Sequence, residues 1–118
     1  MSRLKLNLIL GAAVAVPLLS SPAQAASFNC DRAATKMEQL ICSDAALSRT
    51  DENLAAAYER ALKAASDPEP IRKLQREWLA DTAKHCDSVA CLKNAYAQRI
   101  MQLDSFSARQ ERQANKAR

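Results

Sequence analysis

The stretch CDRAATKMEQLICSDAALSRTDENLAAAY, residues 30–58, decides the fold of this chain. Two cysteines bound its first part, and apolar side chains then recur at the spacing of helix turns, at Leu47, Leu54 and Tyr58. It therefore predicts a helical domain that is held together by a disulfide.

The first 25 residues have the layout of a secretory signal peptide. A basic start precedes an apolar stretch over residues 6–19, and the small-residue triplet Ala23-Gln24-Ala25 follows. We predict cleavage after Ala25, so that the mature protein begins at Ala26. The chain is then expected to be periplasmic or secreted.

A retained membrane anchor is the alternative interpretation of this leader. The apolar stretch is shorter than the roughly 20 residues that a membrane-spanning helix needs, and Pro17 interrupts it. The residues before Cys30, Ser27-Phe28-Asn29, do not form the small-residue lipobox of a bacterial lipoprotein. We therefore expect no stable membrane insertion after cleavage.

All four cysteines lie in the mature part of the chain, at Cys30, Cys42, Cys86 and Cys91. An even number of cysteines in a small exported protein predicts two disulfides. A zinc site is the competing interpretation, because His85 stands beside one of the cysteines. No pair has the Cys-x-x-Cys spacing of a zinc knuckle, so we predict no metal and no cofactor.

Three pairings of the four cysteines are open from the sequence alone. Cys86 and Cys91 can close a short loop between two predicted helices. A bridge from Cys30 to Cys42 needs a break in the helix, because twelve continuous helical steps would separate the sulfurs by about 18 Å. Thr35-Lys36-Met37-Glu38 fits a capping box that starts a helix at this point. We therefore favour the two local bridges.

The mature chain contains no glycine, since the one copy is Gly11 in the leader. Tight hairpins draw on glycine, and alanine is abundant here, so an all-α domain is favoured. Apolar spacing predicts helices over about 35–42, from Ser43 or Asp44 to the turn at 67–70, over 70–84 and over 88–106. The third helix is expected to present inward the side chains of Ile71, Leu74, Trp78 and Leu79. Short connections make a small antiparallel bundle of about four helices, which we expect to be monomeric.

The positive charge lies at the C-terminus. The formal charge of +4 falls to about +2 when the leader is removed, and residues 107–118 hold about +3, which leaves residues 26–106 near −1. A near-neutral body is not typical of a nucleic-acid-binding domain, so no nucleic-acid partner is predicted. We interpret residues 26–106 as the domain and residues 107–118 as a basic, disordered tail.

Two charged residues fall where an apolar core is predicted. Asp51 lies on the stripe of Leu47 and Leu54, and Arg99 lies next to Ile100. A buried charge is unfavourable unless it is paired, so we predict a structural ion pair between Asp51 and Arg99.

The sequence shows no recognisable arrangement of catalytic residues. The one histidine, His85, adjoins a predicted disulfide, and no glycine-rich loop is present to bind phosphate. No catalytic residue is therefore assigned, and we predict that the protein is not an enzyme but binds a protein partner.

The mature chain resembles the LprI-like lysozyme inhibitor family of small exported bacterial proteins over about residues 28–104. The residues that carry the resemblance combine the four cysteines with an aspartate-leucine-tyrosine helix and a glutamine-tryptophan-leucine helix. They are Cys30, Thr35, Glu38, Ile41-Cys42-Ser43-Asp44, Leu47, Asp51, Leu54, Tyr58, Gln75, Trp78-Leu79, Cys86, Cys91-Leu92, Tyr96, Arg99-Ile100 and Leu103.

Membership of this family implies an all-helical, disulfide-bonded domain and, for some members, inhibition of host lysozyme. The expected partner is therefore a lysozyme, and the partner-binding residues are unknown from the sequence. The alternative is an envelope module that binds peptidoglycan or another periplasmic protein and has no inhibitory effect.

Overall fold

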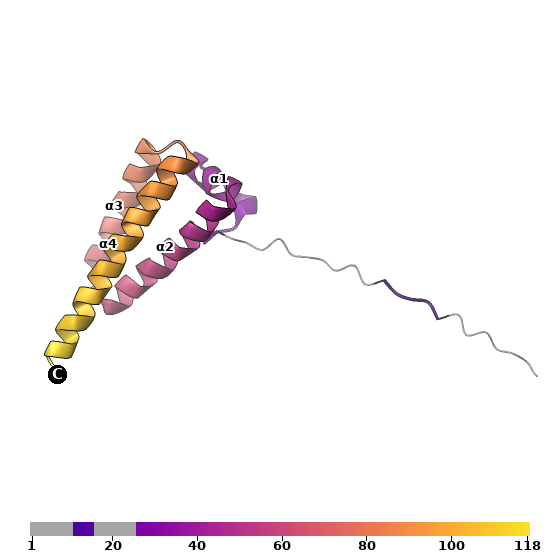
Figure 1. Cartoon of the computed structure of the whole chain (residues 1–118). Helices are drawn as coiled ribbons and strands as arrows, with labels where there is room; N and C mark the ends of the chain where they lie inside the picture. Colours follow the sequence, from indigo (N-terminus) through magenta and orange to yellow (C-terminus); the bar gives the residue numbers. More distant parts are fainter. Residues whose placement is uncertain (1–10, 16–25) are drawn as a thin grey trace, which may run out of the picture.

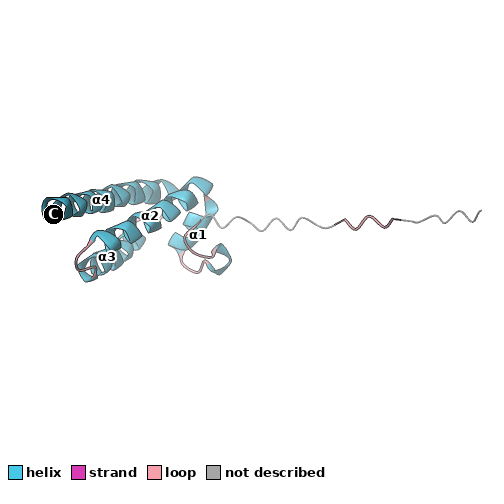
Figure 2. Ribbon diagram, turned by 90° about the horizontal axis from the view of Figure 1, so that it is seen from below, coloured by secondary structure: helices cyan, strands magenta, loops and turns pink. Residues whose placement is uncertain are grey.

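The computed structural model describes residues 11–15 and 26–118, and every regular element in this part of the chain is helical. The short 3₁₀ helix η1 (Cys30–Arg32) is followed by four α-helices, which are α1 (Lys36–Ser43), α2 (Ala45–Ala64), α3 (Glu69–His85) and α4 (Val89–Lys116) (Figures 1 and 2). The predicted all-α class is confirmed. The leader lies outside the described residues except for positions 11–15, so its predicted cleavage stays a prediction.

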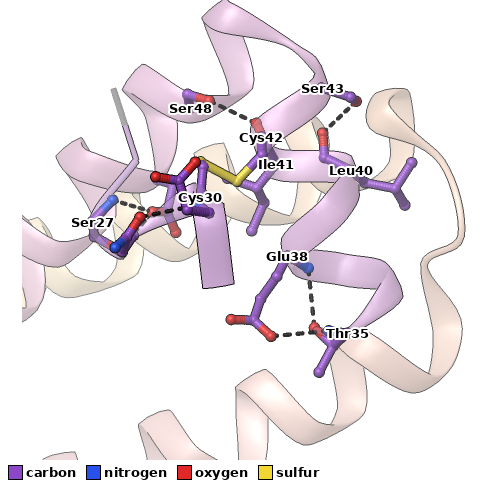
Figure 3. The surroundings of a disulfide bond; sticks show 12 residues. Ser27, Cys30, Thr35, Glu38, Leu40, Ile41, Cys42, Ser43 and Ser48 are labelled. Atoms are coloured by element: carbon purple, nitrogen blue, oxygen red, sulfur yellow. Dashed lines mark hydrogen bonds between the residues drawn. A yellow bond between two sulfur atoms is a disulfide. The ribbon is translucent and has the colours of Figure 1, made fainter. Parts of the chain in front are cut away.

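Local side-chain caps fix where three of the four α-helices begin. The Thr35 hydroxyl accepts from the Glu38 amide at 3.1 Å, and the Glu38 carboxylate accepts from the Thr35 amide at 3.1 Å, which completes the predicted capping box (Figure 3). Asp44 ends α1 and caps α2, where its carboxylate accepts from the Leu47 amide at 2.8 Å. Ser88 caps α4 in the same way. The starts of α1, α2 and α4 are therefore encoded within three residues, whereas α3 begins after Pro68 without a side-chain cap.

The core lies mainly between α2 and α4, which form the most extensive contact in the bundle. These two helices run in the same direction, and α3 returns antiparallel to both (Figure 1). Burying their facing apolar side chains is the main favourable contribution to folding. The buried apolar residues are Ala26, Ile41, Leu47, Leu54, Ala57, Ala61, Leu92, Tyr96 and Leu103.

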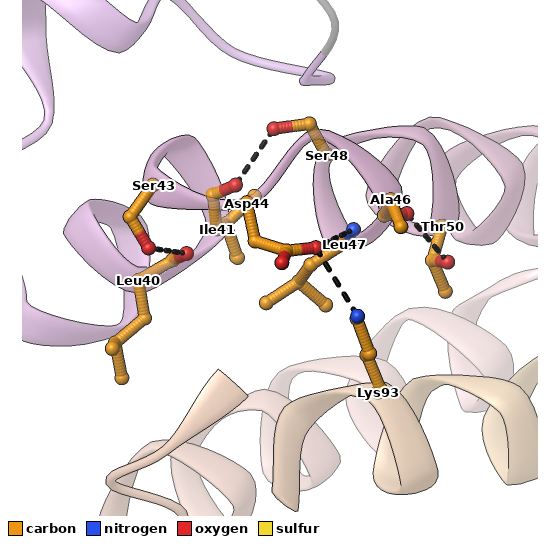
Figure 4. Close-up of polar contacts among 9 residues, drawn as sticks. All are labelled: Leu40, Ile41, Ser43, Asp44, Ala46, Leu47, Ser48, Thr50 and Lys93. Atoms are coloured by element: carbon orange, nitrogen blue, oxygen red, sulfur yellow. Dashed lines mark hydrogen bonds and ion pairs between the residues drawn. The ribbon is translucent and has the colours of Figure 1, made fainter. Parts of the chain in front are cut away.

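Both disulfides lie at the end of the bundle where α1, the start of α2 and the α3–α4 turn meet. Cys30 pairs with Cys42, with 5.8 Å between their Cα atoms (Figure 3). Cys86 pairs with Cys91, with 5.4 Å between their Cα atoms. Both favoured bridges are confirmed. Asp44 lies 3.3 Å from the Lys93 ammonium and joins α2 to α4 at this same end (Figure 4). We call this the stapled end.

The last helix is longer than its sequence predicted. Helix α4 continues to Lys116, past the expected end at Phe106, so most of the predicted disordered tail is helical. Residues 107–116 contain no proline, glycine or β-branched residue, and basic side chains near a helix C-terminus interact favourably with its dipole. Ser107 is buried, and its hydroxyl donates to the Leu103 carbonyl at 3.1 Å. High helix propensity and a buried anchor outweigh the repulsion between the basic side chains.

The inner face of α3 also differs from its prediction. Leu74 is 53% exposed, whereas Gln75 is 6% exposed. Ile71 and Trp78 still pack against the core, and Gln75, on the same helical face, takes the inward position between them, where its side chain finds a polar partner in α4. Among residues 11–15 and 26–118, none of the helices combines the length and the apolar character that crossing a bilayer requires.

Candidate functional site

Asp51 is buried on α2, but its partner is not the predicted arginine. Its Oδ2 atom accepts two hydrogen bonds from Ser27, one from the backbone amide at 2.7 Å and one from the hydroxyl at 2.5 Å. The predicted ion pair between Asp51 and Arg99 is therefore wrong. The segment before η1 folds back over α2, so that Ser27 donates the hydrogen bonds to Asp51 that were expected from Arg99 of α4.

Arg99 instead connects α4 to α3. Its Nε atom donates to the side-chain oxygen of Gln75 at 2.9 Å, and its Nη1 atom donates to the side-chain oxygen of Gln102 at 3.1 Å. The guanidinium carbon lies 5.8 Å from the ring centroid of Trp78, within the range of a cation–π interaction. Partial burial lowers the pKa of the guanidinium from its ordinary value, yet arginine remains charged at neutral pH. Two amides and an indole therefore hold Arg99 in one orientation.

An aromatic pair packs beneath this arginine. The rings of Trp78 and Tyr96 are tilted by 57°, with centroids 5.2 Å apart. Burial, and secondly the negative charge of Asp51, raise the pKa of the Tyr96 phenol well above its ordinary value. Tyr96 is therefore a neutral core residue that lies within electrostatic range of Asp51.

A small cleft of about 170 Å³ opens between α2, α3 and the segment before η1. Its walls are largely apolar, and Asp51 and Gln75 are among its polar groups. We call it the α2–α3 cleft, and the residues that line it are Ser27, Asp51, Leu54, Ala55, Tyr58, Gln75 and Leu79. It is too small to enclose a drug-sized ligand, for which pockets of about 300 Å³ or more are usual.

A broader, shallow hollow of about 440 Å³ lies along α4. Its side chains follow the helical spacing of one stripe, and they are Gln98, Met101, Gln102, Ser105 and Arg109. We call this stripe the outer face of α4. Met101 is 69% exposed, and the stripe contains no acidic residue. It combines one methionine and one arginine, two residue types that are enriched at protein–protein interfaces, with several amide and hydroxyl groups.

Several acidic side chains elsewhere on the surface form ion pairs with basic neighbours. Arg60 and Asp104 form an ion pair at 2.8 Å between α2 and α4, and Lys73 and Glu77 form a weaker pair on α3. Arg109 forms no ion pair with any residue that the structure describes. Its charge is therefore available to an outside partner.

Groups that could carry catalysis do not come together. His85 is exposed at the end of α3, where its Nδ1 atom lies 2.9 Å from the Asp81 carbonyl and 3.1 Å from the Asp81 carboxylate. All four cysteines are in disulfides. Over residues 11–15 and 26–118, no three histidine, cysteine or acidic side chains are grouped so that they could hold a metal ion.

Comparison with known proteins identifies the family. A family model described as "Lysozyme inhibitor LprI" matches residues 30–116, which cover η1 and all four α-helices. The chain belongs to the LprI family. This match extends to Lys116, the last residue of α4, so the family domain includes the part of this helix beyond Phe106, where the sequence pattern ended it.

The curated LprI relatives are mycobacterial. "Lipoprotein LprI" of Mycobacterium tuberculosis and of Mycobacterium bovis are each 35% identical to this chain over 101 residues, which cover 81% of the chain and 51% of the relative. The chain therefore spans about half the length of the curated relatives it matches. No solved structure matches it significantly.

The residues that carried the sequence resemblance to the LprI family have clear structural roles. The cysteines form the two disulfides, Asp51 anchors the segment before η1, and Gln75 and Arg99 join α3 to α4. These roles stabilise the domain. The outer face of α4 was not predicted from the sequence. The one sequence feature that could have indicated it is the helical spacing of uncharged residues before Arg109.

Proposed function

We propose that this chain is an exported, non-catalytic protein that binds and inhibits a lysozyme. The observation that carries the proposal is the match of the LprI lysozyme inhibitor model to residues 30–116. The name lipoprotein on the mycobacterial relatives supports a location outside the cytoplasm. Two disulfides support the same location, because they persist in oxidising compartments.

The outer face of α4 is the proposed contact surface. Glycoside hydrolases of the lysozyme type use two carboxyl groups in a substrate cleft. An unpaired arginine recognises a carboxylate through two parallel hydrogen bonds, and Arg109 is the cation of this stripe. Met101 adds exposed apolar area beside it. A rigid helix carrying both side chains fits a cleft whose floor is acidic.

Long-range attraction contributes little to this interaction. The mature chain is expected to carry about +2, and lysozymes of the common animal type are strongly basic. Electrostatic steering therefore does not favour encounter, and the affinity must come from contacts made within the cleft. We expect inhibition to depend only weakly on salt between 0.05 and 0.2 M.

The test is the rate at which animal-type lysozyme clears a bacterial cell-wall suspension as processed, oxidised protein is added. Saturable slowing is expected, and reduction and alkylation of the disulfides should abolish it. Light scattering of the mixture should give a complex containing one copy of this chain. Absence of slowing at a large molar excess contradicts the proposal, and sedimentation of the protein with isolated cell wall would then support the envelope module instead.

Paired variants locate the contact. Met101→Asp and Arg109→Glu are expected to weaken inhibition about tenfold or more, because each removes a central contact. Leu74→Asp and Arg76→Glu are the matched controls, since they make the same chemical changes at exposed positions of α3. Equal losses in both pairs would contradict the assignment of the contact to α4.

A further inference from the structure

Two features around Ala26 remain unexplained by the binding function. Ala26 is 6% exposed and packs with the core, although it is the first residue of the predicted mature chain. Asp51 is 7% exposed and forms no ion pair with any residue that the structure describes. A buried carboxylate without a cation is unfavourable, and a buried amino terminus without an anion is equally so.

The two features lie next to each other. The Ser27 amide nitrogen is 2.7 Å from Asp51 Oδ2. Consecutive backbone nitrogens are about 3.5 Å apart at most, so the Ala26 nitrogen lies within roughly 6 Å of this carboxylate oxygen. At this separation a positive charge and a carboxylate interact strongly.

Removal of the leader changes the chemistry of this nitrogen. Hydrolysis of the Ala25–Ala26 peptide bond by a signal peptidase adds water, leaving a carboxylate on Ala25 and an amino group on Ala26. The amino group takes up a proton near neutral pH. An uncharged amide nitrogen thus becomes a cation beside Asp51.

We propose that the α-ammonium group of Ala26, created when the leader is removed, pairs with the buried Asp51 and locks the segment before η1 onto α2. The same segment carries Cys30, whose disulfide with Cys42 ties it to α1. The ion pair and the disulfide therefore hold the segment at two points, and both form only after export. Processing itself then stabilises the mature fold.

The test compares two processed forms of the full chain after export from a bacterium, with the first residue of each verified by mass. One is the natural chain, and the other has one glycine inserted between Ala25 and Ala26, which moves the new ammonium group one residue away. The natural form is expected to begin at Ala26 and to melt about 5 °C higher than the extended form. A different first residue, or equal melting temperatures, would overturn the proposal.

Two substitutions separate the ion pair from simple crowding by the extra residue. In Asp51→Asn the difference between the natural and extended forms should disappear, whereas in Ser27→Ala, which keeps both charges, it should persist. A difference that survives Asp51→Asn would overturn the ion pair. If Asp51→Asn does not fold, the Ser27→Ala variant alone decides. Loss of the difference in melting temperature between its natural and extended forms would overturn the ion pair, because the serine contacts would then account for the effect.

Discussion

The stapled end of the bundle and its opposite end are built by different means. The stapled end carries both disulfides, the capping box at Thr35 and the contact of Asp44 with Lys93. The opposite end holds the α2–α3 turn and the last turns of α4, where the ion pair of Arg60 with Asp104 is exposed. We call it the open end.

The difference between the ends separates stability from binding. Covalent links and caps at the stapled end keep the helices in register, so the open end needs few stabilising contacts of its own. The outer face of α4 runs toward the open end and can therefore carry side chains chosen for a partner. Substitutions are expected to affect folding most at the stapled end and binding most along α4.

The largest loss of stability is expected on removal of the first disulfide. Cys30 and Cys42 are separated by 12 residues, so Cys30→Ala with Cys42→Ala should lower the free energy of unfolding by about 3 kcal/mol through loop-closure entropy. The matched change at Cys86 and Cys91, separated by 5 residues, should cost about 2 kcal/mol. Urea unfolding followed by circular dichroism measures both. A larger loss at the shorter loop would reverse this ranking of the two bridges.

The capping box provides the next effect in size. Thr35→Ala removes the hydroxyl that accepts from the Glu38 amide and is expected to destabilise the protein by about 1 kcal/mol. Thr50→Ala is the control, because this hydroxyl donates to the Ala46 carbonyl within α2 and caps nothing. Thermal unfolding of the two variants should therefore differ clearly, and equal shifts would show that the cap contributes nothing specific.

A smaller, pH-dependent effect is expected at Asp44. The Leu47 amide, and to a lesser degree Lys93, hold the pKa of this carboxyl below its ordinary value. Because the folded state favours the charged form, its stabilisation is present above about pH 4, the pKa in the unfolded chain, and is lost as the pH falls through the folded pKa.

Asp44→Asn keeps a capping side chain and removes only the charge. The melting temperature of the natural protein should exceed that of this variant at pH 7, and the two should converge as the pH falls below the lowered pKa of Asp44 in the folded state. A gap that is independent of pH would assign the effect to hydrogen bonding and not to charge.

The smallest effect is expected at the open end. Arg60→Ala breaks the exposed ion pair with Asp104 and should change the free energy of unfolding by about 0.5 kcal/mol or less. Calorimetry at low and high salt measures it, and the change should shrink further in high salt. A loss comparable to that of a disulfide would show that the open end is as important for stability as the stapled end.

The features that could be predicted from the sequence are those encoded by neighbouring residues. Thr35 and Glu38 are three positions apart, and the proline pair after Asp67 stops a helix locally, so the helices and the two short-range disulfides followed from spacing. The resemblance to the LprI family could be recognised for the same reason, because the residues that carry it lie at regular spacings along these helices.

The partners of buried polar groups could not be predicted in this way. Ser27 reaches Asp51 across 24 positions from a segment that has no periodicity, and Gln75 takes the inward position that Leu74 was expected to fill. One signal for Gln75 was present, because it lies four residues after Ile71 and three before Trp78, on the same helical face. A prediction based on the spacing of apolar residues does not include Gln75, because its side chain is polar.

The length of α4 has a mechanical consequence. Its 28 residues rise by about 1.5 Å each, which makes a rod of about 42 Å that begins at the α3–α4 turn and packs against α2 before it reaches its free end. A label or surface tether attached after Arg118 would point away from the disulfides and transmit its orientation through the helix (Figure 1). The chain therefore provides a natural stiff handle, on which distance and orientation measurements can be made without touching the end that holds the fold together.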